Sequence, residues 1–222
     1  KLKNCKAIMR SGSGLDDIPV RAAKALGIQV LNTPEAIAEF VAEHTVGLLL
    51  SFVRQVPQHN NTVKNGGWSA GFSWAQWHVS RQTLGLIGFG LIAQNVTKML
   101  KGFDMNVLAF DPFASAEVFE KYGAASVTFE EVIANSDFIS LHCPLTDETR
   151  HLINENELRK MKKSAVLINT SRGGVIDEKA LVKAIEQKWI SGAALDVTES
   201  EPVEKDNPLL KLDNVIITPH VA

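Results

Sequence analysis

The stretch "LGLIGFGLIA", Leu84 to Ala93, places two glycines and a small residue between an apolar strand pattern and a helix pattern. Its spacing is Gly88-x-Gly90-x-x-Ala93. The first glycine permits a tight turn, the second lets a ligand approach the backbone, and the small third residue lets helix and strand pack closely. Amides at the start of a helix bind phosphate groups. The stretch therefore predicts the strand, turn and helix of a dinucleotide-binding α/β domain.

An acidic residue follows the next strand pattern. Asp111, in "LAFDP", comes 23 residues after Gly88. A carboxylate at this place accepts hydrogen bonds from ribose hydroxyls and repels a 2′-phosphate. A glycine turn alone would be weak evidence, since plain glycine turns have the same spacing. The turn, its flanking elements and Asp111 together predict NAD, in preference to NADP, as the cofactor.

Apolar strand patterns alternate with helix patterns from Thr83 to the last residue. This alternation is typical of an α/β fold in which helices cover both faces of a doubly wound parallel sheet. The strands are expected at 84–88, 106–110, 138–142, 165–169, 192–195 and 215–218. The helices are expected at 91–102, 115–122, 129–135, 155–162 and 178–189.

The first part of the chain predicts a smaller βαβ-type unit and a long helix. Residues 6–9 and 28–31 are strand-like, with a helix-like stretch at 18–27. A helix then starts at Pro34, with Thr33 as its expected cap. Pro57 is expected to end this helix, and a polar, aromatic connection is expected from there to Gln82.

Composition excludes several classes of partner. The 222 residues are 45% hydrophobic and carry a net charge of −2, so no basic excess indicates nucleic acid or an anionic membrane. The apolar runs are interpreted as too short to span a bilayer. Cys5 and Cys143 lie far apart, which favours a reducing, cytoplasmic location. The six histidines form no HxxxH pair, so no metal site is expected.

Three ionisable residues follow strand patterns and so fall at one edge of the predicted sheet. Arg172 follows "AVLIN", Glu201 follows "GAALD", and His220 follows "VIIT". Each alone could be a surface cation, a solvated loop acid or a turn histidine. Ligands of open α/β sheets bind at the carboxyl ends of the strands, so the shared edge favours a common site.

These residue types fit hydride transfer coupled to proton transfer. A guanidinium can hold the carboxylate and the ketone of a 2-oxo acid through its fork of donors. Histidine exchanges protons near neutral pH, and a neighbouring carboxylate would orient its ring and favour its protonated form. The nicotinamide itself carries the hydride.

The chain resembles the D-isomer-specific 2-hydroxyacid dehydrogenases along nearly its whole length, and most of all the C-terminal-binding-protein-like and phosphoglycerate-dehydrogenase-like members. The matching segments are "RSGSGLDDI", "NTPEAIAEFVAEHT", "TLGLIGFGLIA", "FDP", "LHCPLTDETRHLIN", "LINTSRGGVIDEKAL", "GAALDVTESEP" and "NVIITPH". The resemblance implies a Rossmann NAD-binding domain at 33–222 and part of a flavodoxin-like substrate domain at 1–32. It also implies further substrate-domain chain before Lys1 and after Ala222, and a homodimer formed through the helix from Pro34.

The resemblance also implies roles for individual residues. Arg172 would bind and polarise the substrate, Glu201 would pair with His220, and His220 would be the acid and base. The backbone at Ser11 and Gly12 would hold the substrate carboxylate together with Arg172. The implied cofactor-binding residues are Ser13, Gly88, Gly90, Leu91, Ile92, Asp111, Cys143, Pro144, Thr149, Thr170, Ser171 and Asp196.

Two positions depart from the family pattern. Leu91 stands where the family often has an arginine that contacts phosphate, and Asp17 stands where asparagine is usual. The loss of the arginine is expected to weaken cofactor binding.

The sequence thus predicts an NAD-dependent oxidoreductase acting on a small 2-hydroxy or 2-oxo acid. The alternative is an NADH-sensing, partner-binding protein of the C-terminal-binding-protein type. A relative of adenosylhomocysteine hydrolase is disfavoured by the spacing of "TSRGG", "ESEP" and "TPH". The particular acid is left open.

Overall fold

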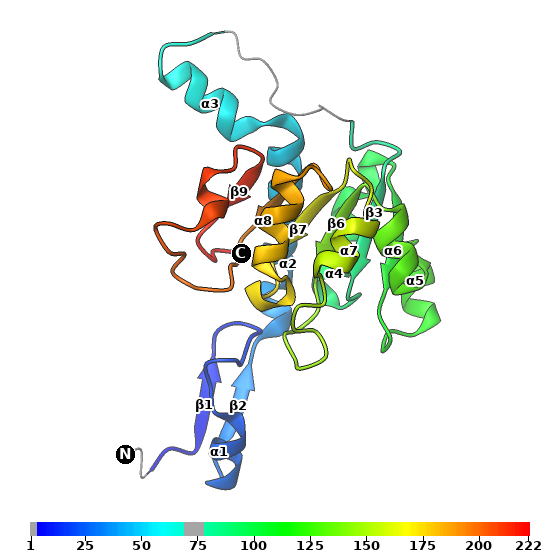
Figure 1. The fold of residues 1–222 in the computed structure, drawn as a ribbon. Helices are drawn as coiled ribbons and strands as arrows, with labels where there is room; N and C mark the ends of the chain where they lie inside the picture. The colour runs from blue at the N-terminus through cyan, green and yellow to red at the C-terminus, as the bar shows by residue number, and fades with distance from the viewer. Residues whose placement is uncertain (1–3, 69–77) are drawn as a thin grey trace.

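The computed structural model describes residues 4–68 and 78–222, which form two parallel sheets (Figure 1). The smaller sheet pairs β1 (Ala7–Arg10) with β2 (Gln29–Asn32). The larger has seven strands in the order β5-β4-β3-β6-β7-β8-β9. Its strands are β3 (Thr83–Ile87), β4 (Asn106–Phe110), β5 (Ala125–Ser126), β6 (Phe138–Leu141), β7 (Val166–Asn169), β8 (Gly192–Leu195) and β9 (Val215–Ile217).

The strand order makes β3 and β6 the switch point of a doubly wound sheet. From β3 the chain proceeds outward to β4 and β5, then returns to β6 on the other side of β3 and continues to β9. All neighbouring pairs are parallel. The predicted fold class is therefore confirmed, and a ligand crevice is expected outside the carboxyl ends of β3 and β6.

Helices cover both faces of the seven-stranded sheet. One face packs against α2 (Pro34–Arg54), α4 (Leu91–Leu100) and α5 (Ala116–Tyr122). The other packs against α6 (Phe129–Asn135), α7 (Glu155–Lys160) and α8 (Glu178–Glu186). The short 3-10 helices η1 (Lys101–Phe103), η2 (Gly173–Val175) and η3 (Pro208–Lys211) lie in the connections.

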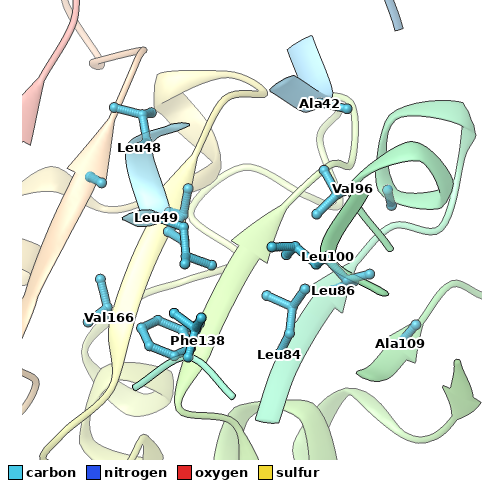
Figure 2. Packing of buried hydrophobic residues seen from close by; sticks show 14 of the residues in the cluster. Ala42, Leu48, Leu49, Leu84, Leu86, Val96, Leu100, Ala109, Phe138 and Val166 are labelled. Carbon is cyan, nitrogen blue, oxygen red and sulfur yellow. The ribbon is translucent and has the colours of Figure 1, made fainter. Parts of the chain in front are cut away.

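Side chains alternate between the two cores because successive residues of a strand point to opposite faces. Leu84 and Leu86 of β3 lie in the core under α2 and α4, as Figure 2 shows. Ile139 and Leu141 of β6 lie in the opposite core. Every residue of β6, β7 and β8 is buried, as expected for central parallel strands.

Helix α2 is longer and more apolar than the sequence analysis anticipated. It has 21 residues with a hydropathy of 1.5, so length and composition alone would allow it to cross a membrane. The expectation that the apolar runs are too short was wrong for this helix. Its contacts with α4, β7, β8 and β9 account for the apolar character, since Leu48, Leu49 and Phe52 are buried against the sheet.

Helix α2 starts at Pro34 with Thr33 at its N-cap position, as predicted, but two details at its ends differ from the prediction. The Thr33 side chain makes no capping bond; its Oγ1 accepts a hydrogen bond from the Gly12 amide instead. The helix ends at Arg54, where Gln55 takes a left-handed conformation. Pro57 then lies in the first turn of another helix, α3 (Val56–Lys64), and does not end helical structure. The rest of the predicted polar connection includes residues 69–77, which lie outside the described part of the chain.

The β1–α1–β2 unit, with α1 at Val20–Ala25, projects from the seven-stranded sheet (Figure 1). It joins α2 through Thr33. The loop after β1 and the start of α2 are tied together, because the Thr33 amide donates to the Gly12 carbonyl. This tie places the loop at 11–16 beside the carboxyl edge of the large sheet.

Candidate active site

The glycine turn after β3 has the geometry that its spacing predicts. Gly88 has a φ of +87°, and a Cβ there would lie 2.8 Å from the His142 carbonyl carbon and oxygen. Gly90 is the N-cap of α4 and is extended, and apart from its two chain neighbours no described atom lies within 4 Å of a Cβ added to it. Gly88 therefore serves close backbone packing, whereas Gly90 faces space that a diphosphate can enter. Ala93 is fully buried under the sheet.

Asp111 is tied to this turn by two hydrogen bonds. The Phe89 amide donates to Oδ2 over 2.7 Å, and the Phe113 amide donates to Oδ1 over 2.8 Å. The carboxylate thus stands beside the glycine turn at the end of β4. That is the place from which it can meet the ribose of a dinucleotide lying across the turn.

The segment after β6 contributes a half-buried, uncharged wall. Burial raises the pKa of the Cys143 thiol to about 11, and Asp111 adds to the shift. Burial lowers the pKa of His142 to about 4, and its Nε2 lies 2.9 Å from Ser140 Oγ. Thr149 braces the following loop, because its hydroxyl donates to the Pro144 carbonyl over 2.6 Å. Thr149 therefore positions this wall through Pro144.

Asn169, the last residue of β7, shapes the segment that follows. Its Oδ1 accepts from the amide and the hydroxyl of Ser171 over 3.0 and 2.8 Å. Its Nδ2 donates to the Arg172 carbonyl over 2.9 Å. Thr170 lies between them, with its hydroxyl 2.8 Å from that of Thr45 on α2. A buried asparagine thus fixes the backbone of the two residues expected in the site.

The guanidinium of Arg172 is held on two sides. Its Nε donates to Asp16 Oδ2 over 2.7 Å, and its Nη1 donates to the Ser171 carbonyl over 2.6 Å. Arg172 Nη2 lies against Gly14, where an added Cβ would overlap it. The arginine therefore has a fixed orientation while donors on Nη1 and Nη2 remain for a ligand.

His220 and Glu201 form the predicted pair. His220 Nδ1 lies 2.6 Å from Glu201 Oε2. Glu201 is anchored in turn, because its Oε1 accepts from the Thr198 amide over 3.2 Å. A carboxylate on Nδ1 orients the ring and leaves Nε2 to exchange a proton with a ligand.

Asp196 is a buried hub at the end of β8. Its Oδ1 accepts from the Thr218 hydroxyl over 2.5 Å and from the Val221 amide over 3.1 Å. Its Oδ2 accepts from the Ala222 amide over 3.0 Å. His44 Nε2, from α2, lies 3.3 Å from Oδ1. Asp196 thereby sets the course of the backbone that carries His220.

These pieces meet in one cavity of about 610 Å³ at the carboxyl edge of the sheet. This volume lies in the range of small-molecule sites. Ten of the residues singled out from the sequence line it, from five separate parts of the chain: Ser11, Gly12, Ser13, Ile92, Cys143, Pro144, Thr170, Ser171, Arg172 and His220.

The other predicted residues lie outside this cavity. Glu201 and Asp196 line a second cavity of about 470 Å³ that shares His220 with the first. Gly88, Gly90, Leu91 and Asp111 lie at the glycine turn, and Thr149 lies in the loop after Pro144. In the described ranges, no cluster of three or more His, Cys, Asp or Glu side chains could hold a metal ion.

Sequence reasoning missed Asp16, Gly14 and Asn169. Asp16 contacts Arg172, which is 156 positions away, so no local pattern could reveal the pair. Asn169 is the last residue of a strand pattern, and Arg172 follows it by three positions. The sequence does not show which of the two holds the backbone and which faces a ligand. The strand-end position itself was the available signal.

The geometry can hold a dinucleotide and an anionic reactant side by side. The turn at Gly90 can take phosphates, Asp111 can take a ribose, and Arg172 and His220 face a common cavity. Fold and site together define a dinucleotide-binding protein of the doubly wound α/β class, with a hydrogen-bonded histidine–glutamate pair at the sheet edge.

Comparison with known proteins identifies the family. Residues 46–222 match the family model described as D-isomer specific 2-hydroxyacid dehydrogenase, NAD binding domain. This match spans most of the chain, so the protein belongs to this family and carries its NAD-binding domain.

Relatives of known name agree. The chain is 46% identical over 221 residues to a D-3-phosphoglycerate dehydrogenase of Methanocaldococcus jannaschii, covering 99% of this chain and 42% of the relative. It is 42% identical over 217 residues to a glyoxylate reductase of Korarchaeum cryptofilum, covering 94% of this chain and 64% of the relative. The chain thus spans less than two thirds of these curated relatives.

A solved structure shows the same architecture. The D-lactate dehydrogenase of Aquifex aeolicus, complexed with NAD and lactic acid, superposes with a TM-score of 0.86 at 35% identity. The similarity covers 97% of this chain and 69% of that one.

Proposed function

We propose that the full-length protein is an NAD-dependent D-2-hydroxyacid dehydrogenase that interconverts a small 2-hydroxy acid and its 2-oxo acid. The observation that carries this proposal is the convergence of Arg172 and His220 on one cavity, with Glu201 hydrogen-bonded behind the histidine. The glycine turn and Asp111 lie at the adjoining strand ends.

The residues around the glycine turn fit NAD. The open space over Gly90 would admit the diphosphate to the amides of Leu91 and Ile92 at the start of α4. Asp111 would accept the ribose hydroxyls. Ser13, Cys143, Pro144, Thr170 and Ser171 would line the nicotinamide end, and Asp196 would hold its carboxamide. NAD supplies the hydride chemistry when bound.

Arg172 and His220 would divide the remaining work. The free donors of Arg172 on Nη1 and Nη2 would bind the carboxylate and polarise the ketone oxygen. The backbone of Ser11 and Gly12 would hold the carboxylate from the other side. In reduction, His220 Nε2 would deliver a proton to the ketone oxygen, and in oxidation it would remove the hydroxyl proton. Glu201 would stabilise the charged imidazolium.

The relatives narrow the reactants to small acids. They are named for glyoxylate, D-lactate and D-3-phosphoglycerate. Glyoxylate is a 2-oxo acid, and D-lactate and D-3-phosphoglycerate are 2-hydroxy acids. A guanidinium and an imidazole in one cavity would bind and react with either kind of acid. We assign the substrate to this class.

We assign residues 1–32 to part of the substrate domain and 33–222 to the NAD-binding domain. The separate two-stranded sheet of β1 and β2 supports this division.

A homodimer through α2 is also part of the proposal. Phe40 on α2 is 68% exposed, so this helix presents a large apolar side chain to a partner. Light scattering on the Phe40→Glu variant would test it: a dimer that persists would contradict this interface.

A reactant panel tests the main proposal. Glyoxylate, pyruvate, hydroxypyruvate and phosphohydroxypyruvate would each be mixed with full-length protein and NADH, and absorbance at the NADH band followed. At least one acid should be reduced, and Arg172→Ala should lose at least about 100-fold in kcat/KM. Arg21→Ala, on the exposed side of α1, is the matched control. No turnover with any acid would refute the function.

The NADH-sensing alternative draws no support from the relatives, which are named for dehydrogenase and reductase activities. Three results together would support this alternative. Partner binding would depend on NADH, the His220→Ala variant would still bind the partner, and no acid would be turned over.

A further inference from the structure

We propose that Asp16 is a positioning residue that orients Arg172 for the reactant. This inference rests on the proposed function and assigns a role to a side chain outside the predicted site. Asp16 Oδ2 accepts from Arg172 Nε over 2.7 Å, and Asp16 lines the same cavity of about 610 Å³.

The geometry leaves Arg172 one orientation. Asp16 holds Nε, the Ser171 carbonyl holds Nη1, and Gly14 lies against Nη2 so closely that a side chain there would overlap it. The side chain of Arg172 is only 27% exposed, whereas Asp16 is 52% exposed. The carboxylate therefore reaches in from the rim and fixes the far end of a partly buried arginine.

Fixing this end has a chemical consequence. An arginine side chain has many rotamers, and this freedom is lost at the moment of binding unless the protein has already restricted it. Asp16 occupies the Nε–H and so turns the Nη donors toward the cavity. The Asp16 carboxylate also offsets part of the guanidinium charge, so its two effects oppose each other for an anionic reactant. The orientation that Asp16 gives Arg172 favours turnover, whereas the negative charge of Asp16 disfavours binding of the anionic reactant.

The loop that carries Asp16 is itself well fixed. Asn32 Nδ2 donates to the Ser13 carbonyl over 2.8 Å, and the Ile18 amide donates to the Leu15 carbonyl over 3.0 Å. Thr33 ties the same loop to the start of α2. The Asp16–Arg172 pair thus connects the β1–α1–β2 unit to the large sheet at the reacting end of the cavity.

The chain offers a matched control in the next residue. Asp17 carries the same charge, is 79% exposed, and pairs at 3.4 Å with Nη1 of a different arginine, Arg10. Asp16→Asn keeps an oxygen acceptor for Nε and removes the charge, whereas Asp16→Ala removes both. Asp17→Asn and Asp17→Ala make the same changes one position away.

The experiment measures kcat and KM for the best 2-oxo acid and the Kd for NADH in full-length protein. Asp16→Ala should lose about 10- to 100-fold in kcat, which is the range expected for a misplaced reactive group. Asp16→Asn should recover most of this loss and bind the acid with an equal or lower KM. The Asp17 variants should match wild type, and NADH affinity should stay constant throughout. Combined with Arg172→Ala, Asp16→Ala should cause no further loss.

A second readout is independent of turnover. In nitrogen-15 NMR, the Nε–H proton of Arg172 should exchange slowly with water in wild type, rapidly in Asp16→Ala, and slowly in Asp17→Ala. If no acid is reduced, the proposed function fails and this measurement alone decides whether Asp16 holds Arg172. Unchanged exchange in Asp16→Ala, or equal kinetics for the Ala variants at 16 and 17, would overturn the inference.

Discussion

Gly90→Ala is expected to separate cofactor binding from folding. Gly90 has a φ of −74°, which alanine adopts without strain, and apart from its two chain neighbours no described atom lies within 4 Å of the added Cβ. Glycine caps a helix somewhat better than alanine, but alanine restricts the unfolded chain more. These effects oppose each other, so the free energy of unfolding should change by no more than about 1 kcal/mol.

The same methyl group should weaken NADH binding. It would stand in the space through which a diphosphate reaches the amides of Leu91 and Ile92. A hydrogen bond to a charged group contributes about 1.5–3 kcal/mol. Losing one such bond raises the Kd for NADH by about 10- to 150-fold. Fluorescence titration with NADH, together with thermal unfolding of the same samples, measures both quantities.

Gly88→Ala provides the opposite pattern. Gly88 has a φ of +87°, and the new Cβ would lie 2.8 Å from the His142 carbonyl. Backbone strain and overlap should cost about 2 kcal/mol or more, which lowers Tm by about 4 °C or more for a chain of this size. If Gly90→Ala bound NADH as wild type does, or lost as much stability as Gly88→Ala, the assignment of the phosphate site to this turn would be wrong.

Three further predictions concern single side chains. Asp111→Asn removes a charge that would repel a 2′-phosphate, so the ratio of kcat/KM with NADPH to that with NADH should rise about tenfold. An unchanged ratio would reject the ribose role. Burial raises the Cys143 pKa from 9.0 to about 11, so iodoacetamide at pH 8 should label this thiol about 100-fold more slowly in folded than in unfolded protein, as peptide mass spectrometry would show. Burial lowers the His142 pKa from 6.5 to about 4, so the neutral form stabilises the fold above pH 6.5 and this stabilisation is lost as the pH falls toward 4. Between pH 7 and 5, denaturant unfolding of wild type should lose about 2 kcal/mol more than His142→Gln loses, and parallel losses would contradict the burial effect.

The regular part of the fold was predictable because each element has its own signal. The strands at 106–110 and 192–195 and the helix at 129–135 were predicted to the residue. Their signal is apolar periodicity closed by polar residues. Helix α3 was missed because Pro57 suits both the end of one helix and the first turn of the next, and the break depends on a single left-handed residue, Gln55.

Only those site residues that directly follow a strand could be predicted from the sequence. Arg172 and His220 were found because each follows an apolar run, and parallel strands bring such positions to one edge. Asp16 was not found because its contact with Arg172 depends on how the loop after β1 reaches the large sheet. The sequence shows two adjacent acids, Asp16 and Asp17, and only the fold decides which one faces the cavity.

The strand-end polar residues divide into two kinds, and the division bears on Asp196. Asn169 ends β7, and its side-chain amide is hydrogen-bonded to the backbone of Ser171 and Arg172. Asp196 follows β8 and is used in the same way, because its two oxygens already accept from Thr218 and from backbone amides at 221 and 222. A carboxylate has about four lone-pair sites, so capacity for a carboxamide remains. A hydrogen bond from the carboxamide would therefore add to the bonds that Asp196 already makes within the protein. The orientation of His220 would depend on Asp196 whether or not NAD is bound.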